Sequence, residues 1–552
     1  MITETQLKNM LTYNIEQQIF CMGLTAQFLV MSDYGNKQEL EDLGIRRLEA
    51  LLSNDEIKEL VGEWEVVWGP VVYQEALGSL GADNCMYMVK CNNAHHSDLY
   101  VIGIAGTNLG LGVSSGGLVE DFWVNETRLW NQGKPWESNP DDQTSKGKRI
   151  SAGITKGLKI LCEMQSKEKY LMEYLSELTS SNENLSITVC GHSLGGGLSP
   201  TLALSLNDQR AQWDPEGKTD LSAFSIAGIT AGNEDFAEYY DQQLGDKTNR
   251  LWNKLGLVPC WFPEDRIEEI PNLYSPFIKP NFLINGFKDL LLKVSEGQHY
   301  RHVCQHQEGF DWEYYPQACQ FVMENFTNYF TDLSALSKLI AKLLLSYEYR
   351  AVNVSQALID QFAETETHLI EAAIEAILSE YETIDIDAKP YVEAIESQLL
   401  DFQTEGADKL LHESLVYKIK DFILFLGQYL YQHMYTHQKY MGVERFIDDI
   451  LIGDITQHVN LPGKSRVTLV NLNDKPDVNG SSDRRKKKRK RKKQSAALKP
   501  LEKITFKLAK RYDDATKTYV IRHKKSNKKK KNGWLKDFSK NYIKAASKLI
   551  KF

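Results

Sequence analysis

The chain of 552 residues lacks several features that mark common classes of protein. Its eight cysteines include no C-x-x-C pair, so neither a zinc knuckle nor a disulfide framework is expected. We expect the cysteines to be reduced and to lie in the core. No stretch of about 18 uninterrupted apolar residues occurs, so we expect no membrane-spanning helix. The N-terminus has no basic start followed by an apolar run, so we expect synthesis in the cytosol and, for any export, a leaderless route.

Signals for a cofactor or a metal are also lacking. The segment GTNLGLGVSSGG (106–117) is rich in glycine but does not end in the Gly-Lys-Ser/Thr of a phosphate-binding loop. We therefore expect no nucleotide here, and the sequence suggests no cofactor and no metal site.

Charge is divided unevenly along the chain. Residues 483–552 hold 28 Lys and Arg against 5 Asp and Glu, a balance of +23. Since the whole chain carries −9, the first 482 residues carry −32. The protein is an acidic body with a strongly basic C-terminal tail.

Strand and helix signals alternate through the first part of the chain, which is typical of an α/β sheet covered on both faces. Strands are expected within 64–74, 85–91 and 98–106, with hairpin character before the last of these, and again within 184–190 and 221–232. The segment 150–178 is expected to form one amphipathic helix. The expected divisions are a helical N-terminal segment (1–65), an α/β core (66–330), a helical insertion or cap (331–430), the end of the core (431–470), a linker (471–483) and a polybasic tail (484–552).

A Gly-x-Ser-x-Gly pattern, Gly191 to Gly195, stands between an apolar β-branched segment and a helical one. This position predicts a nucleophile elbow, a strained strand-to-helix turn from which the hydroxyl of Ser193 projects. The amide of Leu194, at the start of the helix, would face a developing oxyanion. A second donor is expected at Thr107, where the buried strand YVIGIAG ends.

Seven segments in order resemble the class 3 lipases, the family of the fungal triacylglycerol lipases. GHSLGGGL is close to the nucleophile signature of this family, and IAGTN resembles its oxyanion strand, although Ala105 replaces the usual arginine. The other segments are DFWVN (121–125), RISAGITKGL (149–158), AGITAGNEDFA (227–237), RLWNKLGLVPCWFP (250–263) and YRHVCQHQE (300–308). The resemblance implies an α/β-hydrolase core with a mostly parallel sheet and a serine esterase that needs no cofactor.

The acid of the catalytic triad is missing from its usual place. The resemblance puts the family's aspartate where this chain has Gly256. Three interpretations stay open: an acid from a neighbour such as Asp265, a Ser-His dyad or an acid from elsewhere, and a catalytically weak relative. Because oxyanion donors keep residual activity when a triad acid is lost, the absence does not exclude an enzyme.

The base is also open. His302 matches a family histidine that is normally structural, and MENFTNYF (323–330) holds no histidine where the catalytic one is expected. In YQHMYTHQKYM (431–441), His437 precedes Tyr440 as the family's histidine precedes its tyrosine. We prefer His437, with His302, His433 and His368 as the alternatives.

The tail carries ten consecutive cationic residues at 484–493 and a second basic cluster at 523–531. In the last 20 residues, apolar side chains and lysines separate onto opposite faces of a helix, which is the pattern of an interfacial helix. Binding to an anionic membrane surface or an acidic partner is favoured. A core-packing helix and, less favoured, a nucleic-acid role remain open.

Two functions from different classes follow. The first is a lipase or phospholipase that hydrolyses glycerolipid esters through an acyl-enzyme at Ser193, with lipid as substrate and partner. The second is a catalytically degenerate lipase fold that binds lipid or a partner protein. The absence of a leader, the helical insertion and the polybasic tail together also resemble a bacterial secreted effector lipase. Oligomeric state, chain-length preference and positional preference have no signal in the sequence.

Overall fold

The computed structural model describes residues 13–318, except 31–32, 34, 75–80, 94–95, 108–122, 140–145 and 183, and residues 410–446. The expected linker and basic tail, together with His368 and most of the expected helical insertion, lie outside these residues.

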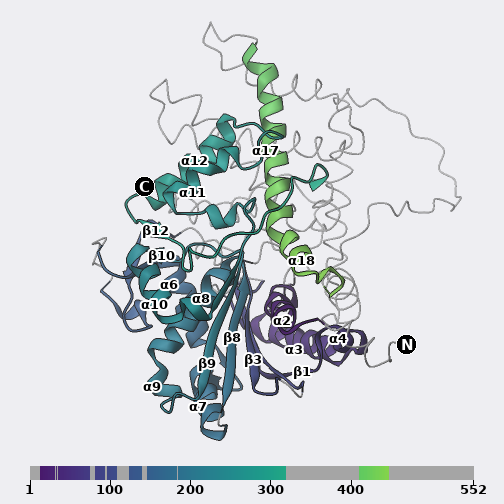
Figure 1. Cartoon of the computed structure of the whole chain (residues 1–552), viewed down its shortest axis with the longest axis vertical. Coiled ribbons are helices and arrows are strands. Elements are labelled where there is room, and N and C mark those ends of the chain that lie inside the picture. The colour runs from purple at the N-terminus through teal and green to yellow at the C-terminus, as the bar shows by residue number, and fades with distance from the viewer. Residues whose placement is uncertain are drawn as a thin grey trace, which may run out of the picture.

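A six-stranded sheet forms the centre of the molecule (Figure 1). The strand order is β1-β2-β3-β8-β9-β11, in which β1, β2 and β3 pair antiparallel, and β3, β8, β9 and β11 pair parallel. This confirms the expected α/β core with a mostly parallel sheet, including the hairpin that joins β2 to β3. The strands are β1 (Trp64–Tyr73), β2 (Asn84–Cys91), β3 (Leu99–Ile104), β8 (Leu185–His192), β9 (Thr219–Ile226) and β11 (Thr248–Leu251).

Both faces of this sheet are buried, because alternate side chains enter two different cores. Along β2, Met86 and Met88 belong to one hydrophobic cluster, whereas Tyr87 and Val89 belong to another. The first core includes residues of α6 (Ala152–Glu163) and α8 (Leu194–Asp208), and the second includes residues of α2 (Ile15–Leu29), α3 (Lys37–Ser53) and α4 (Asp55–Val61). Burial on both faces explains why the strands read as nearly continuous apolar runs. These three helices lie within the N-terminal segment that was expected to be helical.

The expected single helix over 150–178 is wrong. The structure has two helices there, α6 and α7 (Leu171–Ser181), separated by a small hairpin of β6 (Gln165–Ser166) and β7 (Lys169–Tyr170). Lys167 and Glu168 form its turn with φ of 49° and 65°. The apolar period continues in phase through this polar turn, so periodicity alone joined the two helices.

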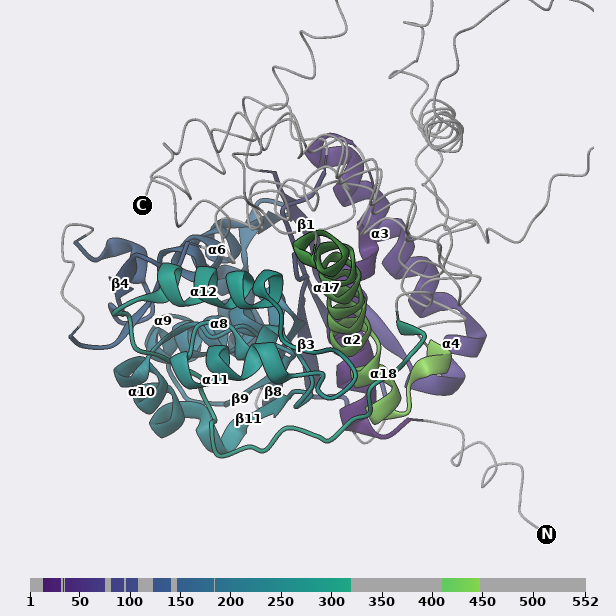
Figure 2. The ribbon, with the colours of Figure 1, turned by 90° about the horizontal axis from the view of Figure 1, so that it is seen from above.

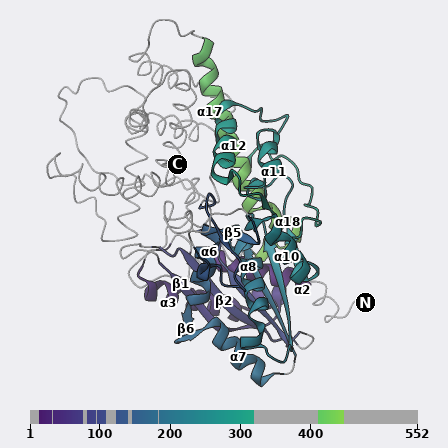
Figure 3. The same ribbon diagram turned by 90° about the vertical axis from the view of Figure 1, so that its left-hand side faces the viewer.

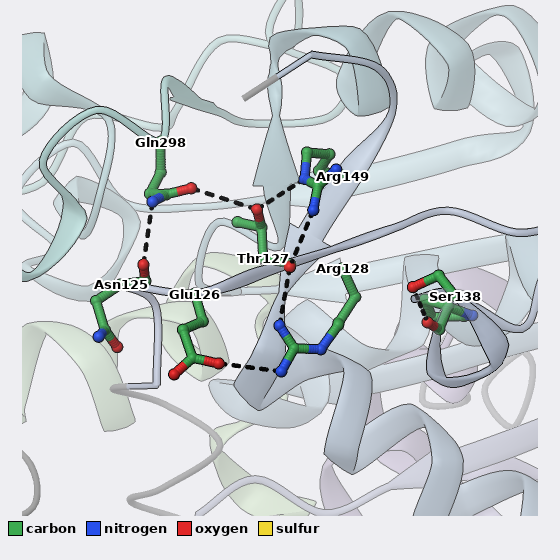
Figure 4. Close-up of polar contacts among 8 residues, drawn as sticks. Asn125, Glu126, Thr127, Arg128, Ser138, Arg149 and Gln298 are labelled. Atoms are coloured by element: carbon green, nitrogen blue, oxygen red, sulfur yellow. Dashed lines mark hydrogen bonds and ion pairs between the residues drawn. The ribbon is translucent and has the colours of Figure 1, made fainter. Parts of the chain in front are cut away.

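A second sheet, β12-β10-β5-β4, is fastened by a buried arginine (Figure 4). Arg149 is 1% exposed, and its Nε donates to Thr127 Oγ1 at 2.9 Å. The hydroxyl of Thr127 also contacts Gln298 Oε1 at 3.3 Å, and Gln298 Nε2 donates to the carbonyl of Asn125 at 3.0 Å. These bonds tie β4 to the loop before β12. The strands are β4 (Thr127–Leu129), β5 (Arg149–Ser151), β10 (Gly232–Asn233) and β12 (Tyr300–Arg301).

The last described segment returns to the N-terminal helices, as Figures 1 and 2 show. Gln17 Nε2 on α2 donates to the carbonyl of Met441 at 2.6 Å, and Val443 and Phe446 are buried in the core of α2. The long helix α17 (Leu410–Met434) leads into α18 (Thr436–Met441) and extends away from the sheet (Figure 3). The expected division at 430/431 therefore falls inside one continuous helix. The remaining helices are α9 (Arg210–Trp213), α10 (Glu234–Leu244), α11 (Glu264–Glu269) and α12 (Phe282–Ser295), with short 3₁₀ turns at Pro135–Glu137, Gly245–Lys247, Val258–Cys260 and Ile270–Asn272.

Within the described ranges, no helix combines the length and the apolar character needed to cross a bilayer. Seven cysteines fall within these ranges, and all are free. The same ranges contain no cluster of three or more His, Cys, Asp or Glu side chains placed to hold a metal ion.

Candidate active site

Ser193 occupies the turn between β8 and α8 with φ 61° and ψ −123°, a strained conformation for a residue with a side chain. Two backbone hydrogen bonds hold the turn in this conformation. The Ser193 N–H donates to the carbonyl of Ile226 at 3.0 Å, and the Ser193 carbonyl accepts from the N–H of Gly197 at 3.1 Å. Ser193 remains partly exposed in an otherwise buried segment. Strand, turn and helix thus hold one serine hydroxyl in a fixed position at the carboxyl end of a parallel strand.

The two glycines that flank the serine are required by close packing. A Cβ at Gly191 would lie 2.4 Å from the carbonyl oxygen of Gly195. A Cβ at Gly195 would lie 2.4 Å from the carbonyl oxygen of Ile104 on β3. Any side chain at either position would separate α8 from the strands, so the pattern around Ser193 follows from geometry.

The segment Gly106–Thr107 lies beside this turn. A Cβ at Gly106 would be 3.1 Å from Cβ of Ser193, and Thr107 is buried. Leu194 is the first residue of α8, where the N–H groups have no acceptor within the helix. The structure therefore brings both expected oxyanion donors, Thr107 and Leu194, to the surroundings of Ser193.

Gln27 on α2 positions the segment Gly106–Thr107, which we call the oxyanion segment, and nothing in the sequence around Gln27 predicts this role. Its Oε1 accepts from the Gly106 N–H at 2.5 Å, and its Nε2 donates to the Thr107 carbonyl at 3.2 Å. Both contacts span about 80 residues, so no local motif identifies Gln27. Because the Gly106 N–H is already bonded, Gln27 also limits which amides can serve an oxyanion.

Three buried histidines gather next to the serine turn. The rings of His192 and His433 lie 4.5 Å apart, and those of His192 and His437 lie 6.1 Å apart. Nε2 of His192 lies 2.9 Å from the carbonyl oxygen of His433. A carbonyl only accepts, so this nitrogen carries the proton. His192 precedes Ser193 directly, so the cluster places the ring of His437, which is about 240 residues away in sequence, beside the residue that precedes the serine.

These histidines are held neutral. Burial lowers the pKa of His192 to about 4, and burial followed by the neighbouring His192 lowers the pKa of His433 and His437 well below the usual value. Neither ring nitrogen of His437 makes a hydrogen bond of good geometry among the described residues, although the backbone of His433 is near enough to raise its pKa slightly against the effect of burial. A neutral imidazole with an unoccupied nitrogen is the form that accepts a proton.

The turn that holds Gly256 lies next to the helices that carry these histidines. Nδ2 of Asn253 donates to Gln432 Oε1 at 2.7 Å and to Thr436 Oγ1 at 2.8 Å. The N–H of Gly256 closes the turn onto the carbonyl of Asn253 at 2.8 Å. The structure thus brings the position of the missing acid to α18, but the polar groups that meet there are neutral.

His302, the alternative base, is committed elsewhere. Its Nε2 lies 2.7 Å from the carbonyl oxygen of Pro259 and 3.0 Å from Thr230 Oγ1. The Thr230 hydroxyl donates to the carbonyl of Trp261, so Nε2 of His302 is the donor in both of its contacts. Burial, followed by the charge of Arg250, lowers its pKa well below the usual value. These contacts describe a structural histidine.

Asp265, the expected acid, lies in the first turn of α11 with its side chain exposed. It faces a cavity whose lining includes neither Ser193 nor His437. No hydrogen bond joins Asp265 to any histidine of the described chain, so the structure does not bring this residue together with the other candidates.

Sheet order, serine turn and oxyanion segment together define a hydrolase-type site on an α/β-hydrolase core. Residues 122–265 match the family model for Lipase (class 3). The chain therefore carries a class 3 lipase domain and is a lipase-type hydrolase, as the resemblance of its motifs predicted. The matched segment includes Ser193 and Gly256 and ends before His302 and His437.

Solved lipase structures are similar over part of the chain. M37 lipase is 25% identical, with 61% of this chain and 100% of that chain covered and a TM-score of 0.48. Lipase II from Rhizopus niveus is 16% identical (48% and 78% covered, TM-score 0.31), and the lipase from Rhizopus microsporus var. chinensis is 15% identical (47% and 69% covered, TM-score 0.30). No curated protein matches the chain. Residues 464–549 match a family of unknown function, DUF6312.

Proposed function

We propose that the protein is a serine esterase that hydrolyses ester bonds of glycerolipids, triacylglycerol or phospholipid, through an acyl-enzyme at Ser193. In the first step the Ser193 hydroxyl attacks the ester carbonyl while His437 accepts its proton. The amides of Thr107 and Leu194 stabilise the oxyanion of the tetrahedral intermediate. His437 then protonates the leaving alcohol, and water releases the fatty acid by the reverse sequence.

The observation that carries this proposal is the strained serine turn with a neutral, unpartnered His437 in the cluster beside it. The test is release of fatty acid from a triacylglycerol emulsion and from phospholipid vesicles, with the Ser193→Ala protein as the blank. Release from either lipid above that blank supports the proposal, and the preferred lipid names the substrate class.

We further propose that Ser193 and His437 work as a dyad. The reason is that Asp265 is exposed at a separate cavity, and the contacts between the Gly256 turn and α18 are made by neutral groups. The Asp265→Asn protein is therefore expected to keep kcat within about threefold of the parent. Loss of a triad acid costs far more, about 10⁴-fold in a serine protease. A fall of more than about 100-fold in kcat, with unchanged folding by circular dichroism, would identify Asp265 as the acid instead.

The missing carboxylate also favours a second candidate function, a degenerate lipase fold that binds lipid or a partner protein without turnover. In such a protein Ser193 would have no activated hydroxyl. Absence of fatty-acid release, combined with retained binding of lipid vesicles, would favour this function over the first.

For the basic tail we propose binding to an anionic membrane surface, because the spacing of its last 20 residues predicts a helix with lysines on one face and apolar residues on the other. The full-length protein is expected to sediment with phosphatidylserine-containing vesicles at low salt and not with neutral ones. Replacing Lys536, Lys540, Lys544, Lys548 and Lys551 with glutamine removes interactions worth about 1 kcal/mol each near the surface, so binding is expected to weaken at least about tenfold. Equal binding of parent and variant, or of anionic and neutral vesicles, would contradict the proposal.

A further inference from the structure

The cavity that Asp265 lines has a volume of about 1310 Å³, and neither Ser193 nor His437 belongs to its lining. It is lined by residues of α11, of the end of α12, and of the segment around β12, which lie near one another in Figure 1. Arg250 of β11 and Trp252, which follows that strand, also line it. We call it the Arg250 cavity.

Arg250 differs from the other arginines around this cavity because its charge is not paired. Arg250 is only 7% exposed. Among the described residues, no carboxylate lies within ion-pair distance of its guanidinium, and the guanidinium makes no hydrogen bond. By contrast, Arg301 contacts Glu234 and Glu238 at 3.2 and 3.3 Å, and Arg266 pairs with Glu269. Burial lowers the pKa of Arg250 to about 10, so it stays charged at neutral pH. A buried charge without a partner is costly, which is typical of a site that binds an opposite charge.

The neighbours of Arg250 form no ion pair with it, although the carboxylate of Asp241 acts on its charge from a greater distance. Its Cζ lies 4.8 Å from the centre of the Trp252 ring, and Cζ of Arg266 lies 5.2 Å from the same ring. His302, which also lines the cavity, is neutral and directs its Nε2–H to Pro259 and Thr230. The cavity therefore presents the unpaired guanidinium of Arg250 beside an aromatic ring, and this group attracts an anion.

The exposed residues that line the cavity are mainly acidic, with Lys293 as the exposed lysine. Glu264, Asp265, Glu296 and Glu308 are exposed carboxylates that form no ion pair with another described residue. These carboxylates disfavour a simple anion, whereas a ligand with a cationic group next to its anionic group would match both Arg250 and the carboxylates.

We propose that the Arg250 cavity binds a small zwitterion, whose phosphate or carboxylate meets Arg250 and whose ammonium group meets the exposed carboxylates. This site goes beyond the proposed ester hydrolysis and does not depend on it. A zwitterion of this kind occurs free in solution and as the headgroup of a phospholipid, so soluble and vesicle-bound probes distinguish the two sources.

The test is isothermal titration calorimetry of the 552-residue protein with phosphocholine, glycine betaine, choline and inorganic phosphate. Binding of the protein to phosphatidylcholine vesicles is measured separately. At least one zwitterion is expected to bind with Kd below about 1 mM, and choline and phosphate at least about tenfold more weakly. Comparing the affinities for phosphocholine and glycine betaine shows whether the site prefers a phosphate or a carboxylate as the anionic group. Binding of the vesicles but not of soluble phosphocholine would assign the headgroup as the ligand. The proposal is overturned if neither the zwitterions nor the vesicles bind, or if phosphate alone binds as tightly as phosphocholine.

Variants separate a binding role from a structural one. Arg250→Gln is expected to abolish zwitterion binding while the ligand-free Tm stays equal or rises, because a buried unpaired charge is removed. Unchanged binding in this variant would overturn the proposal. A double variant, Glu296→Gln with Glu308→Gln, changes exposed side chains and leaves the core intact. Its affinity for phosphocholine is expected to fall at least about threefold, whereas its affinity for phosphate is expected not to fall. An equal effect on the binding of both probes would also overturn the proposal. Arg128→Gln, whose arginine is paired with Glu126 outside the cavity (Figure 4), is the matched control and is expected to bind as the parent does.

Discussion

Replacement of Ser193 by alanine is expected to lower kcat/KM for ester hydrolysis by at least about 10³-fold. The reason is that the β8–α8 turn places one hydroxyl beside the segment Gly106–Thr107, and no other serine in the described part of the chain has a positive φ. Alanine has the same Cβ and fits the same backbone, so folding is expected to be unchanged. Hydrolysis of a short-chain nitrophenyl ester by parent and variant measures the effect.

Ser199→Ala is the matched control. Ser199 lies in the same helix, is fully buried, and makes a single long contact of 3.5 Å to the carbonyl of Gly196. Its loss is expected to change kcat/KM by less than about threefold. If both variants behave alike, or if Ser193→Ala retains the parent rate, Ser193 is not the nucleophile.

Replacement of His437 by alanine is expected to cost about 10³-fold or more in kcat, because the hydroxyl of Ser193 then has no group to accept its proton. The pH dependence gives a second signature. Burial lowers the pKa of His437 well below the usual value of about 6.5, so the imidazole stays neutral and able to accept a proton in mild acid. The rate of the parent enzyme is therefore expected to stay level between about pH 8 and pH 6 and to fall only at lower pH.

The exposed His96, in the β2–β3 hairpin at the other end of the strands, serves as the control for His437. His96→Ala is expected to leave both the rate and its pH profile unchanged. Retained activity in His437→Ala, with loss in the buried His302 variant at unchanged folding, would assign the base to His302 and contradict the structural role derived from its contacts with Pro259 and Thr230.

The sequence predicted the parts of this molecule that depend on local pattern. Apolar strands alternating with helices predicted the parallel sheet, and glycines around Ser193 predicted the turn, because both are short-range consequences of packing. The same reasoning joined α6 and α7 into one helix, since their apolar faces continue in phase across the hairpin at Lys167 and Glu168.

Residues brought together from distant segments were harder to predict. Gln27 carries no motif, because its amide meets Gly106 and Thr107 only after α2 packs on the sheet. Asp265 was favoured because it stands close to Gly256 in sequence, but α11 turns its side chain toward a different cavity. The unpaired charge of Arg250 had no sequence signal, because its isolation depends on which carboxylates other segments place nearby.

Labelling with a fluorophosphonate probe tests the central claim most directly, because only a serine activated by a neighbouring base reacts rapidly. The account predicts one covalent adduct per chain, located at Ser193 by mass spectrometry of peptides, lost in Ser193→Ala and strongly slowed in His437→Ala. A folded parent protein that stays unlabelled, or an adduct that persists in Ser193→Ala, would contradict the assignment of a serine esterase.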